Sequence, residues 1–313
     1  MIKKITIKSI LKYLDQNNHV YNFIGNSHDN VTGYSTLFNY KAESLTFVSS
    51  LNNFSDYETE FKENNIKLII TSPEEKKYSC FSNVIQINKP KFVFFELLEK
   101  FFDTNRQDNT TFSSEENQKY SYISPRAQLG KNVTIGSGSV IEDHVWIGDN
   151  TVVHHNVIIK NSTTIGRNCS IYSGVVIGER GFNPFTNQDG SRTMLKHYGG
   201  VTIEDDVHIG DNSCINRGAI DNTIIKKGAK LNTMVHIAHN CIVGKNTVIT
   251  MPTHVCGSVI IGNNCHIAAT TIRNQCQVGD NAILGLGSVV VKNVEANTTV
   301  VGNPAKLLKK KER

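Results

Sequence analysis

Residues 123–148 read ISPRAQLGKNVTIGSGSVIEDHVWIG, and an aliphatic residue returns in this stretch at every sixth position. Glycine often follows the aliphatic residue, and a small or β-branched residue often stands four positions after it. Neither the period of a strand nor that of a helix produces this pattern. Six-residue repeats of this kind form parallel β-helices, in which each repeat is a short strand plus a turn and three repeats make one coil. The sequence therefore predicts a left-handed parallel β-helix with the aliphatic side chains inside the prism.

The repeat continues far beyond that stretch, in four runs with the same spacing. The runs contain ten, three, eight and three aliphatic positions and start at Ile123, Ile203, Ile225 and Val278. Together they give 24 sides, or about eight coils of three sides. The alternative is an irregular β-sandwich with coincidental spacing, and ten consecutive returns in the first run disfavour it.

The seven cysteines occur singly, with no C-x-x-C pair. Cys169, Cys241 and Cys265 fall on the inner position four residues after the aliphatic one, where a small, soft side chain packs well. We therefore interpret them as packing residues rather than as metal ligands or redox centres. Unpaired cysteines in a chain too long to need disulfide bonds are typical of a reducing compartment, so we expect a cytoplasmic protein.

Interruptions and composition divide the chain into parts. Residues 1–104 mix helix-like and strand-like patterns and predict an α/β domain that could bind the nucleotide or the acceptor. Residues 105–120 predict a polar linker, 121–296 the β-helix and 297–313 a basic tail. Within the β-helix, residues 179–200 are too polar and too long for a coil side and predict a projecting loop. Its aromatic, basic and histidine side chains favour ligand contacts over a plain surface excursion.

Charge and hydropathy argue against a nucleic-acid partner and against a membrane-spanning segment. The formal net charge is +5, and three of the positive charges lie in the run Lys309 to Lys311, so we expect no nucleic-acid partner. The N-terminus carries no uninterrupted apolar signal segment, and no stretch approaches the ~20 apolar residues of a membrane span.

One long stretch resembles a known family. Residues 199–249 read GGVTIEDDVHIGDNSCINRGAIDNTIIKKGAKLNTMVHIAHNCIVGKNTVI and resemble UDP-3-O-acylglucosamine N-acyltransferase, a lipid A enzyme of Gram-negative bacteria. Residues 31–33 and 45–47 stand at places comparable to the family's N-terminal domain. The resemblance implies a homotrimer with active sites between neighbouring β-helices, and it assigns the catalytic base to His239.

N-acyl transfer requires a general base for chemical reasons that do not depend on the family resemblance. An amine that attacks a thioester must lose a proton, and a neutral imidazole is the best-matched acceptor near neutral pH. The residue stacked beside His239 in the next coil lies eighteen positions later and is Gly257. A glycine lets a backbone N–H approach the developing oxyanion closely, and the family gives an equivalent glycine amide that role. The alternative for His239 is a surface imidazole in a turn.

Further polar residues are candidates for acceptor binding, namely His197, Asn232 and His236. Because His236, His239, His254 and His266 cluster in sequence, a zinc site is an alternative. Their spacing does not match a three-histidine site, so we expect no metal.

The chain departs from the family at several positions. The family usually has an acid at the position of Asn232, where it could orient the imidazole, and a second histidine at the position of Asn264. The uracil-binding pattern is only partly present, because Phe47 is followed by Ser50 and Asn53. We interpret Phe47 as a core residue.

The C-terminal stretch VVGNPAK, residues 300–306, is similar to the closing motif of coenzyme A-dependent sugar acetyltransferases. The similarity implies an acyl-CoA donor, with Gly285 and Lys306 as cofactor-binding residues. An acyl carrier protein donor is less favoured, and the lysines could equally form a solvated tail.

The leading hypothesis is an N-acyltransferase that moves an acyl group from acyl-CoA to the amino group of a nucleotide-linked amino sugar for surface glycan synthesis. The first alternative is the lipid A reaction with a 3-hydroxyacyl carrier protein as donor. The second is a non-catalytic β-helix that serves binding or scaffolding.

Overall fold

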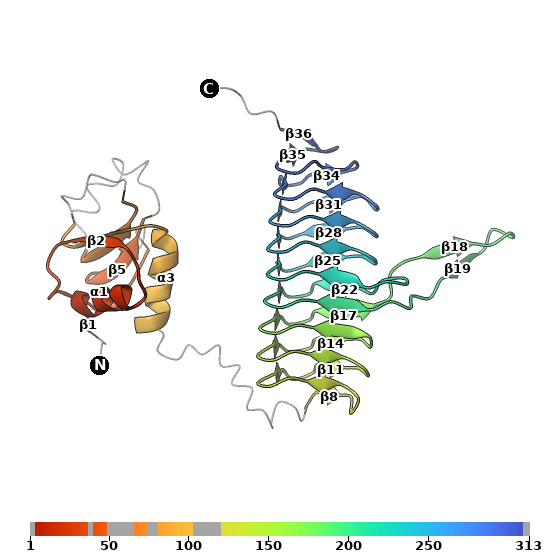
Figure 1. Cartoon of the computed structure of the whole chain (residues 1–313), viewed down its shortest axis with the longest axis horizontal. Coiled ribbons are helices and arrows are strands. Elements are labelled where there is room, and N and C mark those ends of the chain that lie inside the picture. Colours follow the sequence, from red (N-terminus) through yellow and green to blue (C-terminus); the bar gives the residue numbers. More distant parts are fainter. Residues whose placement is uncertain (1–3, 37–39, 49–65, 74–80, 103–119, 309–313) are drawn as a thin grey trace. The chain divides into compact units, whose positions relative to one another are not determined.

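The computed structural model describes residues 4–36, 40–48, 66–73, 81–102 and 120–308 (Figure 1). Two compact units, Met1–Asn109 and Thr110–Arg313, make up the chain. Most of the predicted linker, as well as Ser50 and Asn53, lies outside the described residues.

The N-terminal unit contains a five-stranded sheet and two helices. The sheet order is β2 (Tyr21–Ile24), β7 (Val84–Ile87), β6 (Leu68–Thr71), β5 (Ser44–Phe47) and β4 (Gly33–Tyr34), and only the β2–β7 pair is antiparallel. A small antiparallel pair joins β1 (Ile5–Thr6) to β3 (Asn30–Val31), and the helices are α1 (Ile7–Gln16) and α3 (Pro90–Phe101). Thr6 caps α1, since its Oγ1 accepts a hydrogen bond from the N–H of Ser9.

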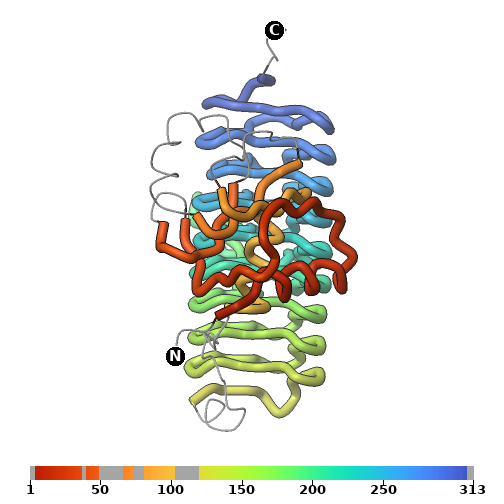
Figure 2. The backbone as a smooth tube through the Cα atoms, turned by 90° about the vertical axis from the view of Figure 1, so that its left-hand side faces the viewer, coloured from red at the N-terminus to blue at the C-terminus, as the bar shows by residue number. Residues whose placement is uncertain are grey.

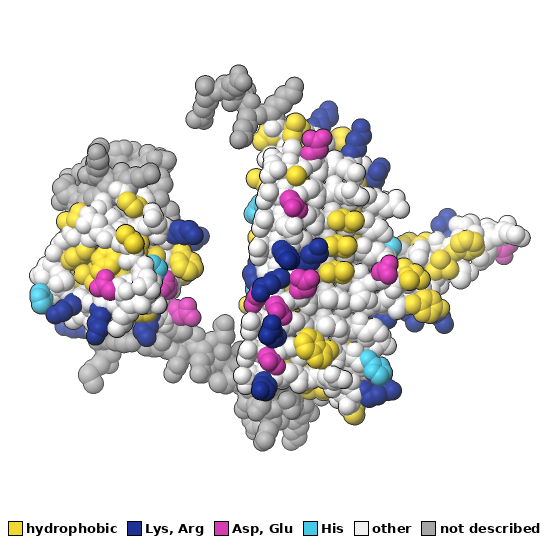
Figure 3. Space-filling view, viewed as in Figure 1, with side chains coloured by type: hydrophobic (Ala, Val, Ile, Leu, Met, Phe, Trp, Pro, Cys, Tyr) yellow, Lys and Arg dark blue, Asp and Glu magenta, His cyan; other side chains and the backbone are white. Residues whose placement is uncertain are grey.

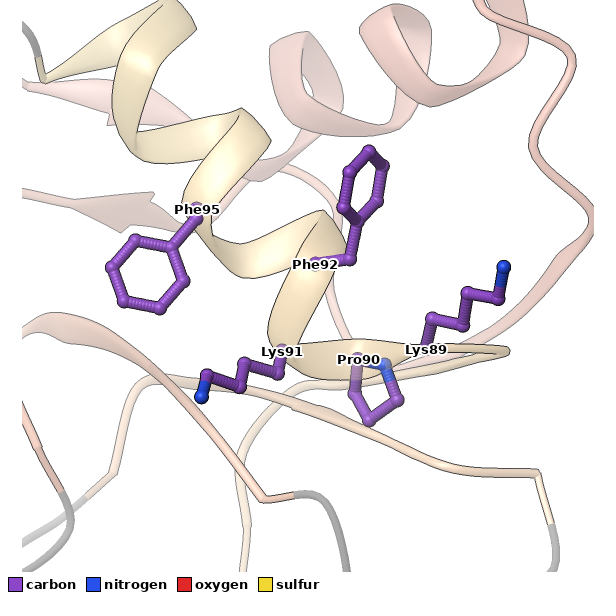
Figure 4. A pocket seen from close by; sticks show the side chains of 5 residues that line it. All are labelled: Lys89, Pro90, Lys91, Phe92 and Phe95. Carbon is purple, nitrogen blue, oxygen red and sulfur yellow. The ribbon is translucent and has the colours of Figure 1, made fainter. Parts of the chain in front are cut away.

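Helix α3 packs on β5 and β6 through its apolar face. The ring of Phe47 lies 4.7 Å from that of Phe94, which confirms that Phe47 packs against the core. On the outer side of the helix start, Phe92 and Phe95 remain exposed beside Lys89 and Lys91, and they border a shallow hollow of about 530 Å³ (Figure 4).

Residues 120–308 form a parallel β-helix of stacked coils with three faces (Figure 2). The β8 face contains β8 (Tyr122–Ile123), β11 (Val140–Ile141), β14 (Ile158–Ile159), β17 (Val176–Glu179), β22 (Cys214–Asn216), β25 (Val235–Ile237), β28 (Thr253–Val255), β31 (Thr271–Ile272) and β34 (Val289–Val290). The β9 face contains β9 (Gln128–Leu129), β12 (Trp146–Ile147), β15 (Thr163–Ile165), β20 (Val201–Ile203), β23 (Thr223–Ile225), β26 (Ile242–Val243), β29 (Ile260–Ile261) and β32 (Gln277–Val278).

The β10 face contains β10 (Thr134–Ile135), β13 (Val152–Val153), β16 (Ser170–Ile171), β21 (His208–Ile209), β24 (Lys230–Leu231), β27 (Val248–Ile249), β30 (His266–Ile267), β33 (Ile283–Leu284) and β35 (Thr299–Val301). A last strand, β36 (Lys306–Leu307), turns back antiparallel to β35.

The predicted aliphatic residues fill the prism. Ile141, Ile159 and Ile177 pair in register along the β8 face, and each is fully buried. Cys169, Cys241 and Cys265 are also buried, which confirms them as packing residues. Burial raises the pKa of Cys241 to about 12, so its thiol stays protonated.

Asparagine side chains stack along one edge of the coils. Asn132, Asn150 and Asn168 each adopt a positive φ between 55° and 58°, a conformation that asparagine tolerates better than most residues. The amide of Asn132 donates to that of Asn150 at 3.0 Å, and neighbouring coils thereby share hydrogen bonds outside the sheets.

The β-helix extends further than the six-residue period predicts. The count of 24 sides omits Ile272 in β31, because it stands five positions after Ile267 instead of six. It also omits Val294, which stands only four positions after Val290 and pairs with Val278, and Val300 in β35, which stands six positions after Val294. The predicted end at residue 296 is therefore wrong: β35 pairs parallel with β33, and residues 299–307 close the stack.

The interruption at residues 179–200 projects from the coils (Figure 1). It contains a hairpin of β18 (Pro184–Thr186) and β19 (Arg192–Met194), paired antiparallel. Figure 3 shows hydrophobic side chains along this arm, and Phe182, Phe185 and Met194 are each more than half exposed. Among the described residues, no helix is both long and apolar enough to cross a membrane.

Replacing Ile159 with alanine should lower the free energy of unfolding by about 2–5 kcal/mol, because the side chain is fully buried between two coils. Urea titration followed by circular dichroism measures this loss. The matched control is Ile283→Ala, whose side chain is 45% exposed and should cost less than about 1 kcal/mol. Equal losses at the two positions would contradict the observed direction of the aliphatic side chains.

Candidate active site

His239 and Gly257 meet at one corner of the β-helix. Each stands two residues after an inner aliphatic residue, and those residues, Ile237 and Val255, pair in register between β25 and β28. A Cβ atom added to Gly257 would lie 2.7 Å from both Nε2 and Cε1 of His239. The structure therefore places the predicted pair in contact, with the Nε2 edge of the ring against the glycine.

Asn240 determines which nitrogen of His239 carries the proton. Its Oδ1 accepts a hydrogen bond from the N–H of Ala219 at 3.1 Å, so the atom is the oxygen rather than the amide nitrogen. The same oxygen lies 2.9 Å from His239 Nδ1, which must donate to it. His239 therefore has its proton on Nδ1 and a bare lone pair on Nε2.

The N–H of Gly257 is free to bind a ligand. At five equivalent turns the N–H donates to an Asp or Asn oxygen of the next coil, namely at Lys131, Arg167, Ser173, Lys245 and Asn263. Within residues 120–308 and the other described ranges, no such acceptor is present for Gly257. A basic nitrogen and an unused amide donor thus lie side by side.

His197, predicted to bind the acceptor, comes from the end of the inserted arm. Its side chain is 5% exposed, and its ring centroid lies 5.1 Å from that of His239. Its Nδ1 accepts a hydrogen bond from the N–H of Gly181 at 3.1 Å. Burial, aided by the neighbouring His239, lowers the pKa of His197.

His236, also predicted to bind the acceptor, contacts the base of the same arm. Its Nε2 donates to Oδ1 of Asn216 at 2.8 Å, while the amide of Asn216 donates to the carbonyls of Glu179 and Arg180. Burial lowers the pKa of His236, with a smaller effect of His254. His236 thus helps to fix the place where the arm leaves the coils, and its acceptor role stays a prediction.

Asn232 does not orient the imidazole. Its side chain lies at the end of β24 on another face, and its Oδ1 accepts a hydrogen bond from the N–H of Thr233. Asn240 instead contacts the ring, because it has a φ of 61° and its amide turns back onto His239. The role of Asn232 in acceptor binding stays a prediction.

The two predicted cofactor-binding residues lie in the last coils. Gly285 follows β33 and its N–H donates to the carbonyl of Val300, while Lys306 is exposed in β36. Their role in donor binding stays a prediction.

The four clustered histidines do not converge. His236 and His254 point outward on the β8 face with ring centroids 6.0 Å apart, whereas His266 lies on the β10 face. In the described ranges, no group of three or more His, Cys, Asp or Glu residues is arranged to hold a metal ion.

Arg217 was not predicted, although it occupies the same corner as His239 one coil earlier. Its Nε donates to the carbonyl of Gly178 at 2.6 Å, and its Nη2 donates to the carbonyl and Oδ1 of Asn161 at 2.8 Å. A pocket of about 250 Å³ lies beside it, lined by Glu142, Lys160, Asn161, Gly178, Glu179, Arg180 and Arg217. Its position two residues after the inner Ile215 is the signal that could have identified it.

Comparisons with known proteins first establish the class. Residues 144–179 match the model "Bacterial transferase hexapeptide (six repeats)", and residues 235–272 match "Hexapeptide repeat of succinyl-transferase". LpxA from Acinetobacter baumannii has a similar structure, with a TM-score of 0.55 and 27% identity over 60% of this chain and 72% of that chain. UDP-N-acetylglucosamine O-acyltransferase (LpxA) from Moraxella catarrhalis RH4 gives 0.55 and 28% over the same shares. The chain therefore contains hexapeptide repeats, and the predicted left-handed β-helix is confirmed.

Individual relatives in sequence carry the name of one kind of acyltransferase. UDP-3-O-acylglucosamine N-acyltransferase from Francisella tularensis subsp. holarctica is 51% identical over 74 residues, which are 24% of this chain and 22% of the relative. The enzyme of the same name from Wolinella succinogenes is 34% identical over 130 residues, or 41% of each chain. The predicted resemblance to this family is confirmed, and the matched part spans less than half of each of these relatives.

Histidine side-chain ¹⁵N NMR should show His239 as a single tautomer with the proton on Nδ1. In Asn240→Ala the signal should change to a mixture that includes the Nε2–H form, because the acceptor for Nδ1–H is gone. Asn232→Ala is the matched control and should leave the His239 signal unchanged. A wild-type ring protonated on Nε2 would contradict the assigned network.

Proposed function

We propose that the protein is an N-acyltransferase that moves an acyl group from a thioester to the amino group of a nucleotide-linked amino sugar. The observation that carries this proposal is the bare Nε2 of His239 beside the unused N–H of Gly257. The names of the relatives favour UDP-3-O-acylglucosamine as the acceptor, which is the first alternative from the sequence. We therefore prefer it to an unspecified surface-glycan precursor.

The two groups divide the work of the reaction. As the amine nitrogen attacks the thioester carbonyl carbon and the C–N bond forms, Nε2 of His239 takes the amine proton. The N–H of Gly257 donates to the negative oxygen of the tetrahedral intermediate, and one such donor is worth about 3 kcal/mol. The C–S bond then breaks as the carbonyl re-forms, and the proton on His239 passes to the departing thiolate.

Asn240 determines how well the protonated form of His239 is stabilised. It holds Nδ1–H in place without a negative charge, so the imidazolium gains a hydrogen bond but no ion pair. Replacing Asn240 with aspartate should therefore move the acid limb of the rate–pH profile to higher pH, because a carboxylate stabilises the protonated ring. A profile of kcat/KM against pH for the two proteins checks this, and an unshifted acid limb would contradict a basic role for His239.

The donor is an acyl thioester, carried either by coenzyme A or by an acyl carrier protein. The predicted donor residues Gly285 and Lys306 favour the former, whereas the lipid A reaction uses the latter. Both donors belong in the assay, in parallel and with the same acyl group.

We further propose a homotrimer, as the resemblance implies. Four of the eight strands of the β9 face carry an apolar outward side chain, and two of these side chains, Trp146 and Ile260, are 41% and 42% exposed. Burial of this face between copies would remove apolar surface from water. Sedimentation equilibrium should give three times the mass of the 34.8 kDa chain, and a monomer mass would contradict the assembly.

The transfer itself is tested by mass spectrometry of the acceptor. Incubation of the protein with UDP-3-O-acylglucosamine and each donor should yield an N-acylated product together with a free thiol. Product from neither donor with any nucleotide amino sugar would overturn the proposal in favour of a non-catalytic β-helix.

His239→Ala should lower kcat by about 10²-fold or more, because the general base is lost. Gly257→Ala should lower it similarly, since the new methyl group would lie 2.7 Å from Nε2. Ile283→Ala is the control, because it truncates a side chain that is 45% exposed and lies on another face of the β-helix. Full activity of His239→Ala would assign proton removal to another group.

A further inference from the structure

The two ends of the inserted arm meet behind the imidazole of His239. Gly181 lies at the start of the arm and His197 near its end, and the N–H of the first donates to Nδ1 of the second. A Cβ added to Gly181 would lie 2.8 Å from Cε1 of His197 and 2.8 Å from Cδ2 of His239. The arm is thus closed by a contact that also abuts the ring of the proposed base.

The ring of His239 is consequently held on three sides. Nδ1 is bonded to Asn240, the Cε1–Nε2 edge faces Gly257, and the Cβ–Cδ2 side faces Gly181. Added Cβ atoms at either glycine would come closer than normal contact distance, so there is no space for the ring to tilt toward either one.

We propose that Gly181 and His197 are positioning residues, which hold the imidazole of His239 so that Nε2 stays directed at the substrate nitrogen. This inference rests on the proposed function, because it takes His239 as the base. It gives the insertion a second role besides any ligand contact.

His197 must be neutral to accept the hydrogen bond from Gly181. The hydrogen bond from Gly181 requires a lone pair on Nδ1, and protonation of the ring would remove it. Burial chiefly, then His239 and the charges of Arg217 and Arg180, lower the pKa of His197, although the Arg217 backbone carbonyl acts in the opposite direction. The ring therefore remains an acceptor near neutral pH.

Substitutions at both residues test the proposal. Gly181→Ala should lower kcat about 10- to 100-fold, because small displacements of a catalytic group are costly, while KM for the acceptor changes less than about threefold. His197→Ala should also lower kcat, and His197→Gln should restore part of it, since a glutamine oxygen can accept the Gly181 hydrogen bond. The control is His144→Asn, an exposed turn residue with a φ of 56° that asparagine adopts readily.

Histidine ¹⁵N NMR provides a readout that does not depend on turnover. In Gly181→Ala and His197→Ala, the His239 signals should shift or broaden, while those of His144→Asn should match the wild type. Unchanged His239 signals together with unchanged kcat, or a loss seen only in acceptor KM, would overturn the positioning role. If the wild-type protein transfers no acyl group, the proposed function fails, and the NMR comparison still decides whether the arm holds the ring.

Discussion

The coil register of the β-helix is the constraint on which the site depends. Each inner aliphatic residue stacks on its counterpart in the next coil, and the sheets fix that stacking along every face. Residues two positions beyond Ile237 and Val255 must then lie side by side, which places an imidazole against a glycine. Because the core is close-packed, His239 and Gly257 cannot move apart along the β-helix without displacing the side chains of several coils.

The site is built where the repeat is interrupted. Residues 180–200 leave the coil after β17, and residues 217–222 form a second excursion after β22. Both segments contribute to the surroundings of His239. Gly181 and His197 of the first segment contact its ring, and the N–H of Ala219 in the second donates to Oδ1 of Asn240, the same oxygen that accepts from His239 Nδ1. A regular coil thus supplies the platform, and the irregular segments supply the groups that hold the ring.

Features that result from the six-residue period are predictable from the sequence, whereas features at its interruptions are not. The stacking of His239 on Gly257 is a consequence of eighteen-residue coils and needs no coordinates. Ile272 and Val294 escape the pattern because they follow the preceding inner residue by five and four positions instead of six, and Val300 is missed together with Val294. The orienting role falls to Asn240 rather than Asn232, because a left-handed turn that folds a side chain back onto its neighbour leaves no periodic signal. His197 is predicted as a ligand contact, but its burial and its bond to Gly181 depend on how the arm closes.

The most direct measurement is a crystal structure of the protein with the amino-sugar acceptor and a ketone analogue of the acyl donor, in which CH2 replaces the thioester sulfur and the carbonyl is kept. The carbonyl oxygen of the donor should accept a hydrogen bond from the N–H of Gly257, and the acceptor nitrogen should lie about 3 Å from Nε2 of His239. Ligands bound elsewhere on the β-helix, with this corner filled by solvent, would contradict the assignment of the active site.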